Sequence, residues 1–191
     1  MTALSVRLRR FLTLTLVAPF TLLVSGSTPA TSTHPPLGVG DPFPTLEAER
    51  LSGAKVVFPE DVNAKANILI LVFKQRAQRI VNTWADIILE ELEPQSTITY
   101  HEVPMISTFY KPFSGGIDSG MRGGIPEQYH DNTTTFYGDR SPYFDKLGMD
   151  KKSSCYVFVL DKDGIIRYRY EGRRTDKAEQ EFRSVISELI R

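Results

Sequence analysis

The stretch Ile68-Leu69-Ile70-Leu71-Val72-Phe73 decides the fold of this chain. It is an unbroken apolar run, rich in β-branched residues, with no polar position on either side of the alternation. A strand of this kind must be covered on both faces. The run therefore predicts a central strand of a sheet that has helices on both sides.

The segment that follows the run changes period. Apolar residues recur every three or four positions, and polar residues lie between them; the apolar positions are Ala77, Val81, Trp84, Ile88 and Leu92. This spacing predicts an amphipathic helix over residues 75–92, which Pro94 ends. A second strand is expected over 97–103, and strand, helix and strand in about 35 residues match a parallel βαβ unit.

The remaining segments complete an α/β layout. Short strands are expected at 45–50 and 55–58, and residues 104–130 read as a long irregular insertion. A short strand at 133–137 and a helical turn at 141–147 follow. Strands at 155–160 and 165–170 are joined by Asp161-Lys162-Asp163-Gly164, a hairpin signal, before a last helix that Thr175 caps. The order is thioredoxin-like: a central mixed sheet flanked by helices, with a long insertion before the C-terminal β-hairpin and helix.

The N-terminus has the features of an export signal. Arg7, Arg9 and Arg10 precede an apolar stretch over 11–24, and small residues follow it. This order is typical of a secretory signal peptide. We therefore expect a signal peptide over 1–26, a flexible tether over 27–39 and a thioredoxin-like domain over 40–191. An uncleaved signal anchor and a mitochondrial transit peptide are the alternatives.

Composition and charge fit a globular protein with no polyanionic partner. Apolar residues make up 41% of the 191 residues and charged residues 24%, close to globular averages. Three of the 23 basic residues lie in the predicted signal, which leaves a net charge of about −3 on the rest. The sequence thus gives no reason to expect nucleic acid as a partner, and it predicts no transmembrane segment beyond the possible anchor.

Several short motifs resemble a known family. Gly40-Asp41-Pro42-Phe43-Pro44 resembles the start of peroxiredoxin-like domains. Val103-Pro104-Met105, the stretch FSGGIDSGMRGGI over 113–125 and YVFVLDKDG over 156–164, together with Ile166-Arg167, resemble the mitochondrial ATP synthase assembly factor "ten" family and its bacterial relatives. The resemblance implies a thioredoxin-like fold and a binding or assembly role. That family acts inside mitochondria, whereas this N-terminus favours export.

The position of a thioredoxin-type thiol is occupied by other residues. Such a thiol lies where the first central strand turns into its helix, because the helix N-terminus stabilises the thiolate. Here that segment reads Phe73-Lys74-Gln75-Arg76-Ala77-Gln78-Arg79, without a CxxC or Thr-x-x-Cys motif. The single cysteine, Cys155, opens an apolar strand and is expected to be buried and inert. We therefore expect no catalytic residue.

Two groups of residues are candidates for binding. Lys74, Arg76 and Arg79 at the helix start could hold an anion, or could form a plain solvated turn. The insertion could contact a protein partner, or could simply pack against the sheet over the empty thiol position; its candidate residues are Phe109, Tyr110, Phe113, Ile117, Met121 and Arg122. A short helix there would pair Asp118 with Arg122.

No metal or cofactor is expected. The three histidines, His34, His101 and His130, lack the spacing of a zinc site. The segment that starts at Asp161 resembles a calcium loop but has Gly172 where that loop requires glutamate, so it is interpreted as a hairpin turn.

These observations favour a non-catalytic binding or assembly-factor-type protein in an extracytoplasmic compartment, periplasmic or secreted. A mitochondrial location is the alternative for a eukaryotic host. Two other functions stay open: a peroxiredoxin-like thiol oxidoreductase that uses Cys155 with an external thiol, and a domain that binds a small anion at Lys74, Arg76 and Arg79.

Overall fold

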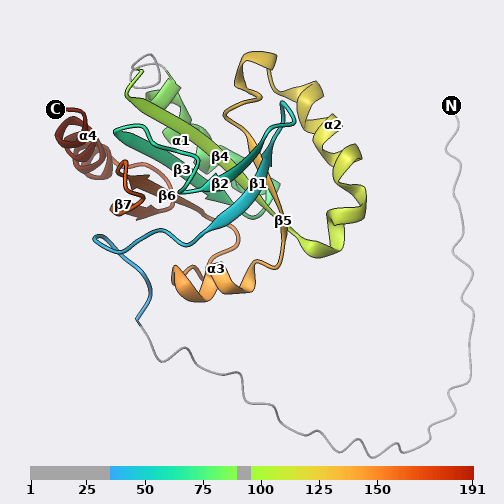
Figure 1. Cartoon of the computed structure of the whole chain (residues 1–191), viewed down its shortest axis with the longest axis horizontal. Helices are drawn as coiled ribbons and strands as arrows, with labels where there is room; N and C mark the ends of the chain where they lie inside the picture. The colour runs from blue at the N-terminus through green and yellow to red at the C-terminus, as the bar shows by residue number, and fades with distance from the viewer. Residues whose placement is uncertain (1–34, 90–95) are drawn as a thin grey trace, which may run out of the picture. The chain divides into compact units, whose positions relative to one another are not determined.

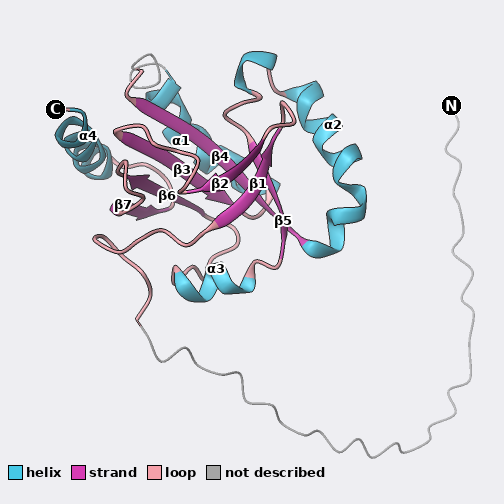
Figure 2. Cartoon of the chain, viewed as in Figure 1, coloured by secondary structure: helices cyan, strands magenta, loops and turns pink. Residues whose placement is uncertain are grey.

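A computed structural model of the chain describes residues 35–89 and 96–191. Its strands lie at the centre with helices around them (Figures 1 and 2). The strands are β1 (Leu46–Arg50), β2 (Lys55–Phe58), β3 (Ala66–Val72), β4 (Ile98–Ser107), β5 (Thr134–Gly138), β6 (Cys155–Leu160) and β7 (Ile166–Glu171). The α-helices are α1 (Gln78–Ile87), α2 (Ser114–Gly124), α3 (Ser141–Lys146) and α4 (Asp176–Ile190), and the 3₁₀ helices are η1 (Gln75–Ala77), η3 (Thr108–Phe113) and η4 (Glu127–Tyr129).

The described strands form one mixed sheet in the order β2-β1-β5-β4-β3-β6-β7. β3 is parallel to β4 and antiparallel to β6, and every one of its residues is buried. β4 is parallel to β5, and β6 and β7 form the closing hairpin. The predicted central strand and the thioredoxin-like α/β layout are thereby confirmed.

Alternation along β3 divides the core into two layers. Ile68, Ile70 and Val72 face α1 and α4, in a cluster with Trp84 and Phe182. Each helix contributes an apolar stripe at helical spacing, which is the physical reason that it lies on the sheet. Thr175 caps α4 as predicted, because its side chain accepts a hydrogen bond from the backbone N–H of Ala178.

The opposite face of the sheet has its own core. Leu69 and Leu71 pack there with Phe158 and with residues from the N-terminal strands and from the segment around α3. Phe43 stacks edge-on against Phe158 with ring centroids 5.4 Å apart. Both faces of β3 are therefore covered, as its uninterrupted apolar sequence requires.

The insertion differs from its prediction. β4 continues to Ser107, four residues beyond the expected end, and the following segment is mostly helical, whereas an irregular loop was expected. The predicted helix over 75–92 begins with the 3₁₀ turn η1 and continues as α1; its expected end at Leu92 and Pro94 lies outside the described residues, as do the predicted signal and most of the tether. Within 35–89 and 96–191, no helix has the length and apolar character of a membrane span.

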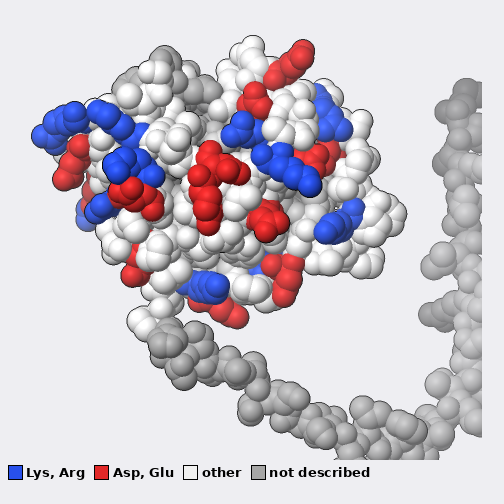
Figure 3. All heavy atoms as spheres, viewed as in Figure 1, with Lys and Arg blue, Asp and Glu red and all other residues white. Residues whose placement is uncertain are grey.

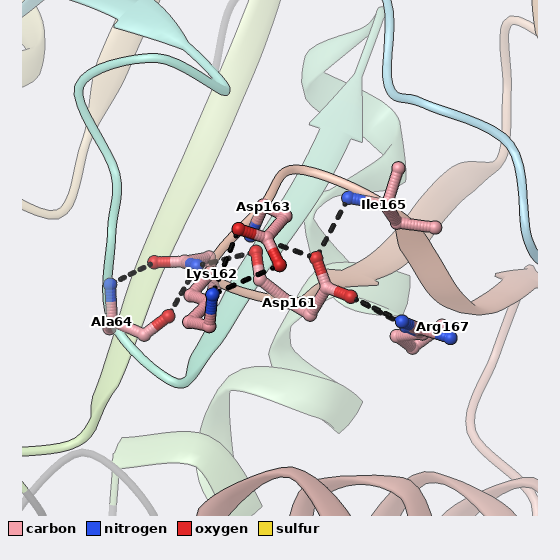
Figure 4. Close-up of polar contacts among 7 residues, drawn as sticks. Ala64, Asp161, Lys162, Asp163, Ile165 and Arg167 are labelled. Atoms are coloured by element: carbon pink, nitrogen blue, oxygen red, sulfur yellow. Dashed lines mark hydrogen bonds and ion pairs between the residues drawn. The ribbon is translucent and has the colours of Figure 1, made fainter.

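Asp161 organises the turn between β6 and β7 (Figure 4). Its carboxylate accepts hydrogen bonds from the backbone N–H groups of Asp163 and Ile165, at 2.9 and 3.0 Å, and pairs with the Arg167 guanidinium at 2.6 Å. Gly164 adopts φ of 77°, where a side chain would also meet the Pro59 ring. The segment is a hairpin turn, as predicted, and its carboxylate is used inside the fold.

Replacing Asp161 by alanine is expected to lower the free energy of unfolding by about 2 kcal/mol, because two backbone donors and Arg167 lose a nearly buried acceptor. Urea unfolding followed by circular dichroism measures this. Asp163→Ala is the matched control: its carboxylate is exposed and, among the described residues, pairs only with the neighbouring Lys162, so we expect a change below about 0.5 kcal/mol. Equal losses in the two variants would contradict this role for Asp161.

Candidate functional site

Cys155 lies on β6 beside Val72 of β3, and its side chain points into the core under α1 and α4. It is 0% exposed, and its Sγ lies 3.7 Å from the carbonyl oxygen of Gly172. Burial raises the pKa of the thiol to about 12. At neutral pH a thiolate is therefore almost absent, and the sulfur is a poor nucleophile. The burial expected for Cys155 is confirmed.

We expect Cys155 to react with an aromatic disulfide reagent at least about 1000-fold more slowly in the folded chain than in urea, because the folded thiol is both inaccessible and protonated. Absorbance of the released thiolate follows the reaction. Fast stoichiometric labelling of Cys155 in the folded chain at pH 7.5 would contradict its buried position. It would favour the thiol oxidoreductase hypothesis instead.

The predicted cations lie at the start of α1. The side chains of Lys74, Arg76 and Arg79 are exposed, and within the described part of the chain none of these side chains forms an ion pair or hydrogen bond. On the face drawn in Figure 3, basic and acidic side chains are interspersed, without a continuous region of one sign.

The 3₁₀ helix η3 presents an aromatic surface to solvent. Phe109 is 73% exposed, Phe113 61% and Tyr110 49%. Among the described residues the only other large apolar side chain with comparable exposure is Val39. We call Phe109, Tyr110 and Phe113 the aromatic patch. Isolated exposed apolar residues are ordinary, but three together mark a candidate contact site.

Helix α2 crosses from β4 to β5, and none of its residues is buried. Polar contacts hold it instead: Tyr137 donates to Asp118 at 2.7 Å, and Arg122 donates to the carbonyl of Leu51 at 3.1 Å. These contacts replace the ion pair that was expected between Asp118 and Arg122. In Figure 1 α2 lies on the opposite side of the domain from α4. The helix is fixed in place but does not pack into the core.

A cavity of about 1050 Å³ separates α2 from the sheet and α1. From α2 it is lined by Ile117, Gly120, Met121 and Gly124, and from the helix start by residues that include Lys74, Arg76 and Arg79. Both predicted groups therefore meet at one cavity. Tyr110 also lines it, whereas Phe109, Phe113 and Arg122 do not.

Glu102, which was not predicted as a site residue, also lines this cavity. Its carboxylate accepts hydrogen bonds from Gln78 Nε2 at 3.4 Å and Tyr100 Oη at 3.5 Å. Burial raises the pKa of Glu102, and these two hydrogen bonds only partly oppose it. The sequence did contain a signal for this position. Glu102 lies two residues after Tyr100 and two before Pro104 in β4, and alternate residues of a strand share a face. Arg140 lines the cavity too and donates to the carbonyl of Met105 at 3.3 Å.

Solved structures with a similar fold come from thiol and assembly proteins. A thiol peroxidase from Chromobacterium violaceum shares 9% identity (82% of this chain, 90% of that one, TM-score 0.54). The cytochrome c oxidase assembly protein BsSco of the Sco family shares 12% (80% and 98%, TM-score 0.53), and a peroxiredoxin-like protein from Aquifex aeolicus 14% (78% and 89%, TM-score 0.50). At these identities the likeness establishes the thioredoxin-like fold alone.

Sequence comparison identifies the family. A search of curated protein sequences found no match. The family model described as ATP10 protein matches residues 41–189, which is most of the chain and includes the central strands, the insertion and the C-terminal helix. The chain therefore belongs to the ATP10 protein family.

Proposed function

We propose that this protein is a non-catalytic assembly factor that holds a protein partner on its aromatic patch. The observation that carries the proposal is the contrast between two sites on one scaffold. The only cysteine is sealed in the core, while Phe109, Tyr110 and Phe113 are exposed on the insertion. Exposed aromatic residues supply much of the binding energy in protein interfaces.

Family membership supports the same function. The resemblance to ATP synthase assembly factors implies that the partner is a subunit of that complex or an intermediate in its assembly. A protein that handles such a partner needs no nucleophile, and Phe73-Lys74-Gln75-Arg76-Ala77 supplies none at the thioredoxin-type position. Ile117, Met121 and Arg122, predicted as further partner contacts, lie on α2, the helix that follows η3 along the chain.

We also propose that the protein acts outside the cytoplasm, in the periplasm or after secretion, with mitochondria as the alternative in a eukaryotic host. The basic and apolar character of residues 1–26 motivates this. Intact-mass measurement of the protein from its own cells tests it: removal of about 26 residues is expected, and a full-length mass in the cytoplasmic fraction would contradict it.

A photo-crosslinking amino acid at position 109 or 113 tests the partner site. Expressed in source cells that lack the native gene, both variants are expected to form a covalent adduct with an ATP synthase subunit, identified by mass spectrometry. Position 39 is the matched control, because Val39 is 66% exposed but lies far from the insertion in sequence. The same adducts from position 39, or none from 109 and 113, would overturn the proposal.

The double variant Phe109→Ser, Phe113→Ser gives the functional readout. Loss of two central aromatic contacts is expected to weaken binding at least about 30-fold and so to reduce assembled ATP synthase on native gels. Because both side chains are exposed, the free energy of unfolding should change by less than about 0.5 kcal/mol. Val39→Ser should leave both measurements unchanged.

A further inference from the structure

The crossover helix α2 stands off the sheet. In a βαβ unit the crossover helix normally buries an apolar stripe against the strands. α2 has such a stripe at helical spacing, formed by Ile117, Gly120, Met121 and Gly124, but the stripe lines the cavity and no residue of the helix is buried. Because hydrogen bonds fix α2 from its flanks, the space is part of the fold and not a packing defect.

The walls of this cavity are mostly apolar. Leu89 of the α1 segment, Ile106 of β4, and Ile117 and Met121 of α2 face it from three elements. Its volume of about 1050 Å³ is slightly above the usual range for small-molecule sites, which is about 300–1,000 Å³. Gly120 and Gly124 widen it, because a Cβ at either position would meet no atom within 4 Å.

Its charged residues are predominantly basic. Lys74, Arg76, Arg79 and Arg140 line it, and Glu102 is the only acidic residue among the described residues that line it. Glu102 accepts hydrogen bonds from Gln78 and Tyr100 and forms no ion pair with these four cations in the described part of the chain. The charge of the basic side chains is therefore left for a ligand.

We propose that this cavity binds an amphiphilic anion, a single carboxylate or phosphate head on an apolar chain. The apolar chain would lie between α2 and β4, and the head would face Lys74, Arg76 and Arg79. This extends the predicted small-anion site, because a bare anion would leave the apolar walls unfilled. Tyr110 of the aromatic patch also lines the cavity, but Phe109 and Phe113, the two positions tested by crosslinking, do not, so the two proposals can be tested separately.

A matched pair of glycine substitutions on α2 tests the site. Gly120 lines the cavity, so Gly120→Leu adds a side chain to its wall, whereas Gly123, on the same helix, does not line it. Both positions have open space for a side chain, and leucine favours helix over glycine, so both variants should fold at least as well as wild type. The probe is dodecanoate, measured by its displacement of the fluorescent fatty acid cis-parinarate.

Wild type and Gly123→Leu are expected to bind dodecanoate in one saturable site, and Gly120→Leu about tenfold more weakly or worse. The double variant Arg76→Gln, Arg79→Gln is expected to weaken dodecanoate binding about tenfold. Arg173→Gln, which removes an exposed cation that does not line the cavity, should leave the binding unchanged. Dodecanol and inorganic phosphate should each bind more weakly than dodecanoate, because each offers half of the required chemistry.

A separate experiment distinguishes a membrane lipid from a soluble amphiphile as the ligand. Capture by vesicles of phosphatidylcholine with phosphatidic acid, reduced in Gly120→Leu but not in Gly123→Leu, would identify a membrane lipid; uptake of free dodecanoate alone would identify a soluble amphiphile. Either result supports the site. Absence of saturable dodecanoate binding, equal binding by the two glycine variants, or preference for dodecylamine would overturn it, and none of these bears on the crosslinking experiment.

Discussion

Replacing Trp84 by alanine is expected to lower the free energy of unfolding by about 4 kcal/mol, the range for a large buried aromatic. Trp84 is 0% exposed and joins three parts of the core. Its ring centroid lies 5.4 Å from those of both Tyr170 and Phe182, and its Nε1 donates to the carbonyl of Gly172 at 2.9 Å. Truncation would remove the contacts between α1, α4 and the β7 hairpin at once.

Urea unfolding by circular dichroism measures this effect, since the variant lacks the only tryptophan. Trp84→Phe should lose about half as much, because it keeps an aromatic ring and gives up only the hydrogen bond and part of the volume. Phe109→Ala is the control for an exposed aromatic and should change the free energy by less than about 0.5 kcal/mol. A loss below about 2 kcal/mol in Trp84→Ala would contradict the packing described.

Acidification from pH 7.5 to pH 4 is expected to cost about 3 kcal/mol of stability through His101 alone. Burial, and secondarily the Arg50 cation, lowers its pKa to about 4, while Asp131 acts in the opposite direction. The unfolded state takes up a proton near pH 6.5 and the folded state only near pH 4. The contribution is therefore present above pH 6.5 and is lost as the pH falls towards 4.

The variant His101→Gln isolates this effect. Its free energy of unfolding should change little between pH 7.5 and pH 4, where wild type loses stability. Any remaining change should come from titratable groups that both chains share. One of these is Glu102, whose raised pKa acts in the opposite sense, since its contribution is lost as the pH rises. Parallel pH profiles of the free energy of unfolding for wild type and His101→Gln would show that His101 is not held neutral in the fold.

The fold could be predicted because its main signals are local. The apolar run at Ile68–Phe73, the helical spacing around Trp84 and the Asp161 turn each specify an element by its own sequence, and their order gives the layout. The core residues around Trp84 and Phe182 follow from the same periodicities.

The insertion could not be predicted in the same way. Five of the eleven residues of α2 are glycine, which costs up to about 1 kcal/mol each relative to alanine in a helix, so propensity argued against a helix there. Contacts distant in sequence stabilise it, notably those of Asp118 with Tyr137 and of Arg122 with Leu51. The cavity and the role of Glu102 depend on where α2 lies relative to the sheet. From the sequence, the spacing of Ile117 and Met121 could indicate only that they share a face of a helix.

The proposed function is binding without sulfur chemistry, and complementation by a chain without cysteine tests it most directly. Source cells lacking the native gene would express either wild type or Cys155→Ala, and assembled ATP synthase would be compared on native gels at equal protein levels. We predict equal restoration, because Cys155 is a buried core residue. Failure of folded, equally abundant Cys155→Ala to restore the complex would contradict the central claim.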